Sequence, residues 1–84
     1  MKRAVVKTLP VYLDQKPTTQ DDNHYGIVSR WDVYAVDALG SKDMKLVGRL
    51  VEYDRNYSSY MEEQYCLFIL GTRVPINPEW IDWY

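Results

Sequence analysis

The stretch "YGIVSRWDVYAVDALGSKDMKLVGRLVEYD", residues 25–54, decides the fold that we expect. Two runs rich in β-branched and aromatic residues, 25–38 and 44–54, flank a short polar segment, 39–43, which contains Gly40. Apolar and polar side chains alternate along the second run, as they do in a strand with one buried face. The pattern predicts an antiparallel hairpin.

The chain on either side of this hairpin also favours strands. Residues 3–13 hold several β-branched side chains, and Pro10, which lacks an amide proton, predicts an edge or a strand end near that position. The apolar run within 65–74 is too hydrophobic for a surface strand and predicts a buried one, with Gly71 at its end. Gly48 lies inside the hairpin and predicts a bulge or a tight bend.

Two polar segments separate these strands. Residues 14–24 are the clearest predicted loop, because they are polar and contain a proline and an asparagine. Residues 55–64 are ambiguous, since Ser59 and Glu62 fit a capping box that could start one or two helical turns. The alternative is a turn between strands, and we favour a turn with brief helical character.

The last eight residues, "NPEWIDWY" (77–84), predict a short helix. Asn77 is a suitable N-cap and Pro78 suits the first helical position. Helical spacing would place three aromatic residues on one face: Trp80, Trp83 and Tyr84. A helix this short is unstable alone in water, so its aromatic face needs a surface. That surface is either the protein's own sheet or another chain.

The expected fold class is mainly β with minor α, in a single domain spanning residues 1–84. Short connections and the lack of long helices favour an antiparallel four-stranded meander or a partly open SH3-like barrel, with a short C-terminal helix. Eight tyrosines, three tryptophans and one phenylalanine supply bulky side chains for a small core.

The charge balance excludes few partners but disfavours nucleic acid. The net charge is −2, and no basic stripe of the kind that tracks phosphates is evident. Residues 1–49 carry a net +2 and residues 50–84 a net −4, which indicates solvated surface or a weakly acidic docking face.

The sequence predicts a soluble, cytoplasmic protein. The longest apolar run, "CLFIL", is far shorter than the roughly 20 residues that cross a bilayer. Lys7 and Pro10 interrupt any signal-peptide core. Cys66 is the single cysteine, so it cannot form an intramolecular disulfide, which favours a reducing compartment and a buried, inert thiol.

No residue pattern indicates catalysis, a cofactor or a metal site. His24 is the single histidine, and nothing in the sequence places it beside Cys66 as an activating base. The segment "QDDNH" (20–24) has oxygen donors but lacks the spacing and the glycine of a calcium loop. Adjacent carboxylates such as Asp21 and Asp22 would point to opposite faces of a strand, and a flexible loop would fix the position of neither. We therefore expect a protein that is not an enzyme.

The tyrosines are the most informative candidates for a site. Four of them lie within residues 53–65, interleaved with an arginine and acidic residues. Tyrosine, tryptophan and arginine are enriched at binding hot spots, although a small domain also uses tyrosine at the rim of its core. The predicted protein-binding residues are Tyr53, Arg55, Tyr57, Tyr60, Glu62, Glu63, Trp83 and Tyr84.

Three functions compete at this point. The first is a small intracellular protein-binding module, an inhibitor or modulator of a larger complex, by analogy with small viral proteins carried by phages. Its partner is another protein or a second copy. The alternative is a nucleic-acid-binding small β-barrel with a Tyr/Arg platform extended by Lys42, Lys45 and Arg49. The third is an enzyme or metal protein centred on residues 21–24.

Overall fold

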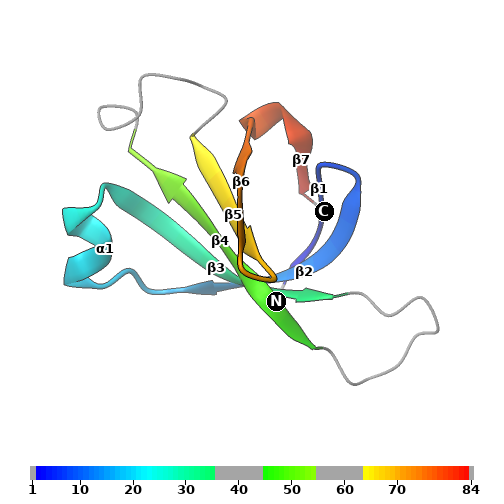
Figure 1. Cartoon of the computed structure of the whole chain (residues 1–84), viewed down its shortest axis with the longest axis horizontal. Coiled ribbons are helices and arrows are strands. Elements are labelled where there is room, and N and C mark those ends of the chain that lie inside the picture. Colours follow the sequence, from blue (N-terminus) through cyan, green and yellow to red (C-terminus); the bar gives the residue numbers. More distant parts are fainter. Residues whose placement is uncertain (1, 36–44, 55–63, 84) are drawn as a thin grey trace.

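The computed structural model describes residues 2–35, 45–54 and 64–83, which form one antiparallel sheet curled into a half-barrel (Figure 1). Its strands are β1 (Lys2–Val6), β2 (Leu9–Lys16), β3 (Ile27–Ala35), β4 (Leu46–Tyr53), β5 (Tyr65–Ile69), β6 (Thr72–Ile76) and β7 (Ile81–Trp83). The order across the sheet is β6-β5-β4-β3-β2-β1-β7. Chain neighbours are therefore sheet neighbours, except that β7 crosses over to pair with β1.

The predicted central hairpin is confirmed as β3 and β4, which pair antiparallel. The predicted irregularity at Gly48 is also confirmed, because the register slips beside it and Val47 is the extra residue of a bulge. A Cβ atom at Gly48 would overlap the carbonyl oxygen of Phe68 on β5, so the backbones approach too closely for a side chain. The bend and the close approach help the sheet to curl.

Two runs that we expected to be single strands are hairpins, and part of the predicted C-terminal helix is a strand, so the prediction of four strands is wrong and seven are described. Residues 3–13 contain a turn at Lys7 and Thr8, whose φ angles are 48° and 71°. Residues 65–74 turn at Leu70 and Gly71, with φ angles of 51° and 77°. Two-residue hairpin turns need such positive φ values and usually signal themselves with glycine or asparagine. The first turn has neither residue, so the sequence did not predict it.

The prediction for Pro10 is confirmed. Pro10 stands opposite Val5 of β1, but pairing of β2 with β3 begins only at Val11. The missing amide proton therefore falls where β2 has no described partner on that side.

The polar segment 14–24 is not the loop that we expected. β2 continues to Lys16, and residues Gln20–His24 form a helical turn, α1. Thr19 and Asp22 make a reciprocal capping box: the Asp22 N–H donates to Thr19 Oγ1 at 3.1 Å, and the Thr19 N–H donates to Asp22 Oδ2 at 2.8 Å. The bond from Thr19 lowers the pKa of the Asp22 carboxyl, which also lies 3.5 Å from Arg30. Asp22 stands where the usual capping-box pattern has a glutamate, so the sequence pattern did not predict this box.

The predicted C-terminal helix is wrong beyond its first turn. Asn77 does cap, since its Oδ1 accepts the Glu79 N–H at 3.0 Å, but the helix is one 3₁₀ turn, Pro78–Trp80. The chain then becomes β7 and pairs with β1. Alternation puts Ile81 and Trp83 on the same face, and the edge of β1 supplies backbone hydrogen bonds that stabilise a strand more than an isolated short helix.

The core lies on the concave face of the sheet. Its buried members are Ala4, Val6, Val11, Leu13, Val33, Leu50, Leu67, Ile76 and Ile81. Cys66 is buried as expected, beside Val51 on the opposite, convex side of the β4–β5 pair. The expected turn or short helix at 55–64 falls almost entirely outside the described residues. Among those that are described, no helix has the length and apolar character to span a membrane.

Candidate functional site

The curl of the sheet brings Trp83 of β7 onto Trp31 of β3. Their ring centroids are 5.4 Å apart and the rings are inclined by 48°. β1 and β2 lie between these two strands in the sheet, so only the curvature makes the contact possible. Trp83 stands opposite Ala4 of β1, whose small side chain leaves room for the indole on the concave face.

The contact continues across the concave face to Tyr65 of β5. The centroids of Trp31 and Tyr65 are 6.2 Å apart, and the Tyr65 hydroxyl donates to Glu52 Oε2 at 3.2 Å. Trp83, Trp31 and Tyr65 thus form an aromatic row from one edge of the half-barrel to the opposite half of the sheet. The pairing of Glu52 with Tyr65 across β4 and β5 holds the far end of the row.

The hydroxyl at that end resists ionisation. Burial, the negative charge of Glu52 and the hydrogen bond to its carboxylate together raise the pKa of Tyr65 from 10.0 to about 12. Each cause disfavours the phenolate, either because the site is poorly solvated or because a second negative charge lies beside it. At neutral pH Tyr65 therefore serves as a hydrogen-bond donor.

The shifted pKa of Tyr65 predicts a loss of stability in alkali. Between pH 10 and about 12 the unfolded chain loses the Tyr65 proton while the folded protein keeps it, so the free energy of unfolding falls as pH rises. Urea unfolding curves across this range should show a steeper fall for the wild type than for Tyr65→Phe. Parallel pH dependences for the two proteins would contradict the assignment.

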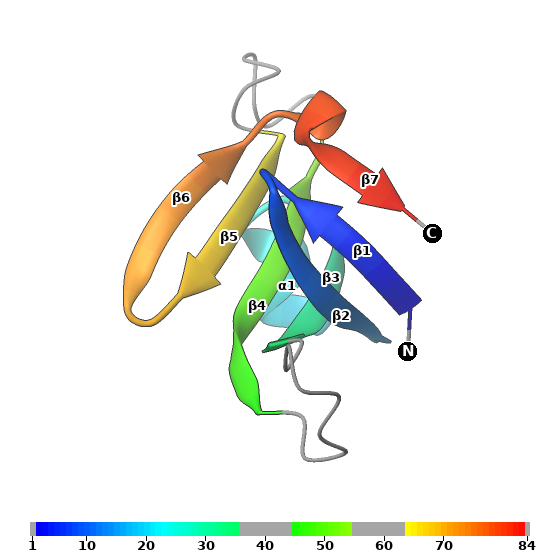
Figure 2. The same ribbon diagram turned by 90° about the vertical axis from the view of Figure 1, so that its right-hand side faces the viewer.

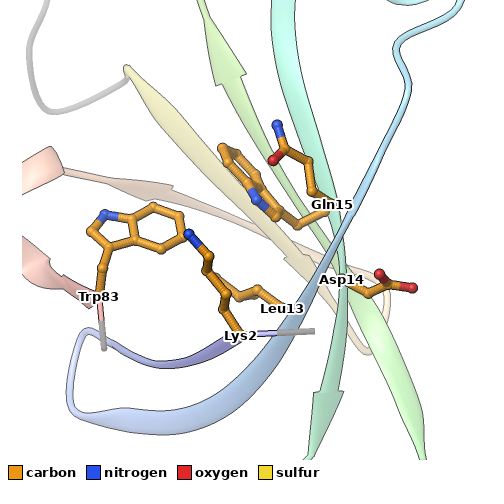
Figure 3. A pocket seen from close by; sticks show the side chains of 6 residues that line it. Lys2, Leu13, Asp14, Gln15 and Trp83 are labelled. Atoms are coloured by element: carbon orange, nitrogen blue, oxygen red, sulfur yellow. The ribbon is translucent and has the colours of Figure 1, made fainter.

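A hollow of about 430 Å³ opens beside Trp83 at the mouth of the half-barrel. It is lined by Lys2, Leu13, Asp14, Gln15, Trp31 and Trp83. Figure 3 shows that the side chains of Lys2 and Gln15 project toward the same side as Trp83, whereas the Asp14 carboxylate points away. That carboxylate pairs with Lys16 at 2.9 Å, which lowers the pKa of Asp14. The mouth therefore combines aromatic surface with an amine and an amide.

Trp83 and Trp80 do not share a face, contrary to the expected helical arrangement. Both remain nearly half exposed, at 44% and 42%. Trp80 lies under the Lys7 amine, 5.0 Å from its ring centroid, in a separate hollow with Glu79 and Asp82. Trp83 alone of the two reaches the aromatic row.

The structure does not bring the two described members of the predicted site together. Alternation along β4 places Tyr53 on the convex side, opposite to the face that Trp83 covers, and the Tyr53 N–H donates to the Gln64 carbonyl at 2.8 Å. The remaining predicted residues lie outside the described ranges: Arg55, Tyr57, Tyr60, Glu62, Glu63 and Tyr84. Their role as a binding surface stays a prediction.

Sequence reasoning missed Trp31, Lys2 and Gln15 as parts of one site. Gln15 and Trp31 are paired across β2 and β3, but this register cannot be read before the first hairpin is recognised. The sequence did contain one signal for a strand, because Ile81 and Trp83 are two positions apart, as side chains on one face of a strand are. This spacing supports a strand no less than the spacing of Trp80, Trp83 and Tyr84 supports a helix.

Little at this site points to catalysis or metal binding. Within 2–35, 45–54 and 64–83 no cluster of three potential metal ligands exists. The His24 ring packs edge-on against Tyr25 at 5.3 Å, away from the aromatic row. Aromatic faces with a few flanking polar groups offer contact area, which is chemistry suited to binding.

The chain matches no family model, no curated protein sequence and no solved structure. The geometry of the mouth therefore carries the functional argument.

Proposed function

We propose that this protein is a small protein-binding module that acts by surface contact, without catalysis, on another protein in the cytoplasm. The observation that carries the proposal is the position of Trp83, which stands at the mouth of the half-barrel, packed on Trp31 and still 44% exposed. A large aromatic side chain that packs against the protein on one side and is exposed to solvent on the other resembles a hot-spot residue. An inhibitor or modulator of a larger complex, as among small phage proteins, fits this mode by analogy only.

Two physical features support binding through this mouth. Trp83 is partly immobilised by Trp31, so it loses little side-chain freedom when a partner covers it. Lys2 and Gln15 flank the indole and can orient a partner by hydrogen bonds (Figure 3). An apolar anchor with polar groups around it is the usual anatomy of a protein interface.

The test uses the full chain to capture partners from the native cell, followed by purification of the captured protein and titration calorimetry. Trp83→Ala is expected to weaken binding at least about 30-fold, which is the loss typical of a hot-spot residue. Tyr25→Ala removes an exposed aromatic side chain at the end of α1, outside the mouth, and should bind within about threefold of wild type, as interface-neutral positions do.

Three other outcomes would contradict this surface or support another one. Equal affinities for Trp83→Ala and wild type would overturn the proposed surface. Loss of binding only in the double variant Tyr57→Ala plus Tyr60→Ala would move the interface to the tyrosine segment. Binding to mixed oligonucleotides that weakens steeply with added salt would instead support the nucleic-acid alternative.

A further inference from the structure

The strand that carries Trp83 has one side without a described partner. β7 ends the sheet, with β1 on one side only, and Figure 2 shows its other side facing outward. The Lys7 N–H donates to the Trp80 carbonyl at 2.8 Å, which fixes the alternation of backbone groups along β7. Asp82 therefore directs its N–H and C=O toward β1, while Ile81 and Trp83 direct theirs to the open side.

The groups on that open side can be identified. The Ile81 N–H donates back to the Pro78 carbonyl, so it is occupied by the 3₁₀ turn. The Ile81 carbonyl and the Trp83 N–H have no strand partner within 2–35, 45–54 and 64–83, and they can pair with an added strand. An antiparallel strand would use both of these groups in neighbouring hydrogen bonds.

The other end of the sheet is less suited to strand addition. On β6 the alternation that starts at the Leu70–Gly71 turn leaves Arg73 and Pro75 facing the open side. Pro75 has no N–H, and proline and lysine or arginine side chains are among the devices by which proteins protect sheet edges. The three residues of β7 include neither a proline nor a cationic side chain, and their one charged residue is Asp82.

Charge selects what can pair with β7. The carboxylates of Asp82 and Glu79 make no ion pair within the described ranges and line one hollow of about 340 Å³ with Lys7. Self-pairing of β7 in two copies would satisfy the backbone but would set Asp82 opposite Asp82, and like charges directly opposite are destabilising. A strand with a lysine or arginine opposite Asp82 has the complementary charge.

We propose that the open side of β7 binds an extended segment of another protein as an added antiparallel strand. The segment has a basic residue opposite Asp82, and apolar residues on either side of it lie on the concave face against Trp83 and Ile81. This inference rests on the proposed function, and it names the chemistry of the partner segment.

The test presents the full chain with two synthetic libraries of nine-residue peptides, in which random apolar residues alternate with lysine or with glutamate. The lysine library should be enriched on the wild type, and the selected peptides should bind at least about fivefold more weakly to Asp82→Lys. Asp82→Lys should in turn enrich the glutamate library. Asp21→Lys changes the net charge equally on α1, far from β7, and should leave the lysine preference intact.

Backbone pairing is tested separately with a selected peptide. Methylation of the peptide nitrogens that face β7 should abolish binding, whereas methylation of the alternate nitrogens should leave it within about threefold, because only one set pairs with the sheet. Failure to enrich either library, equal preference for both charges, or tolerance of both methylation patterns overturns the inference. The affinity of Trp83→Ala for the captured partner judges the proposed function independently of these results.

Discussion

Replacement of Leu50 with alanine is expected to lower the free energy of unfolding by about 2–5 kcal/mol. Leu50 is fully buried, and it is paired with Trp31 on β3 and Leu67 on β5 in the middle of the sheet. The loss combines the transfer energy of the removed methyl groups with the cavity left beneath the aromatic row. A domain of this length has a total stability of about 4–13 kcal/mol, so the variant should be markedly less stable.

Urea unfolding followed by tryptophan fluorescence measures this effect. The matched control is Leu46→Ala, which removes the same atoms from the same strand at a side chain that is 54% exposed. Its free energy of unfolding should stay within about 0.5 kcal/mol of wild type. Similar losses for the two variants would contradict a core on the concave face of β4.

Gly48→Ala is expected to destabilise the protein by about 3 kcal/mol, although alanine normally favours regular structure over glycine. The new Cβ would overlap the carbonyl oxygen of Phe68, which belongs to the backbone and cannot rotate away. β4 and β5 would have to separate locally, breaking the register that supports Leu50. Thermal unfolding by circular dichroism should show a correspondingly lower midpoint.

Gly71 separates this steric effect from backbone strain. Gly71 has a φ angle of 77° and nothing within 4 Å of an added Cβ, so Gly71→Ala should lose about 1–2 kcal/mol through conformation alone. Asparagine tolerates this conformation, so Gly71→Asn should recover part of the loss. Gly48→Asn should be at least as harmful as Gly48→Ala. Recovery by asparagine at Gly48 would refute the steric cause.

The parts of the fold that could be predicted were those in which several local signals agreed. Residues 25–54 combine alternation, β-branched side chains and a polar connection, and their hairpin was found. The bulge at Gly48 could be predicted because a glycine inside a strand commonly marks a bulge, a tight bend or a close approach of two backbones. The turn at Lys7 and Thr8 was missed because tertiary pairing holds two ordinary residues in a conformation that they rarely adopt alone.

The site could be predicted only in part. Trp83 was selected from the spacing of the aromatic residues within 77–84, but that spacing was interpreted as one face of a helix, and the helix lasts one turn. Its contact with Trp31 depends on the curvature accumulated across four strands, which no local pattern encodes. Tyr53 was selected because four tyrosines cluster within residues 53–65, and alternation along β4 places it on the other side of the sheet.

In the proposed function, the pairing of β7 with β1 determines what fraction of the protein molecules can bind a partner at any moment. Every other strand pair joins neighbours along the chain, whereas this one joins the first described strand to the last. The pairing closes a loop that contains the whole sheet and is held by only three residues of β7, so it is the contact with the least local support. Trp83 reaches Trp31 only while this strand is docked. In the proposed function, the apparent affinity of the mouth would be the intrinsic affinity scaled by the fraction of molecules in which β7 is paired with β1, and a partner that adds a strand to β7 would raise that fraction as it binds.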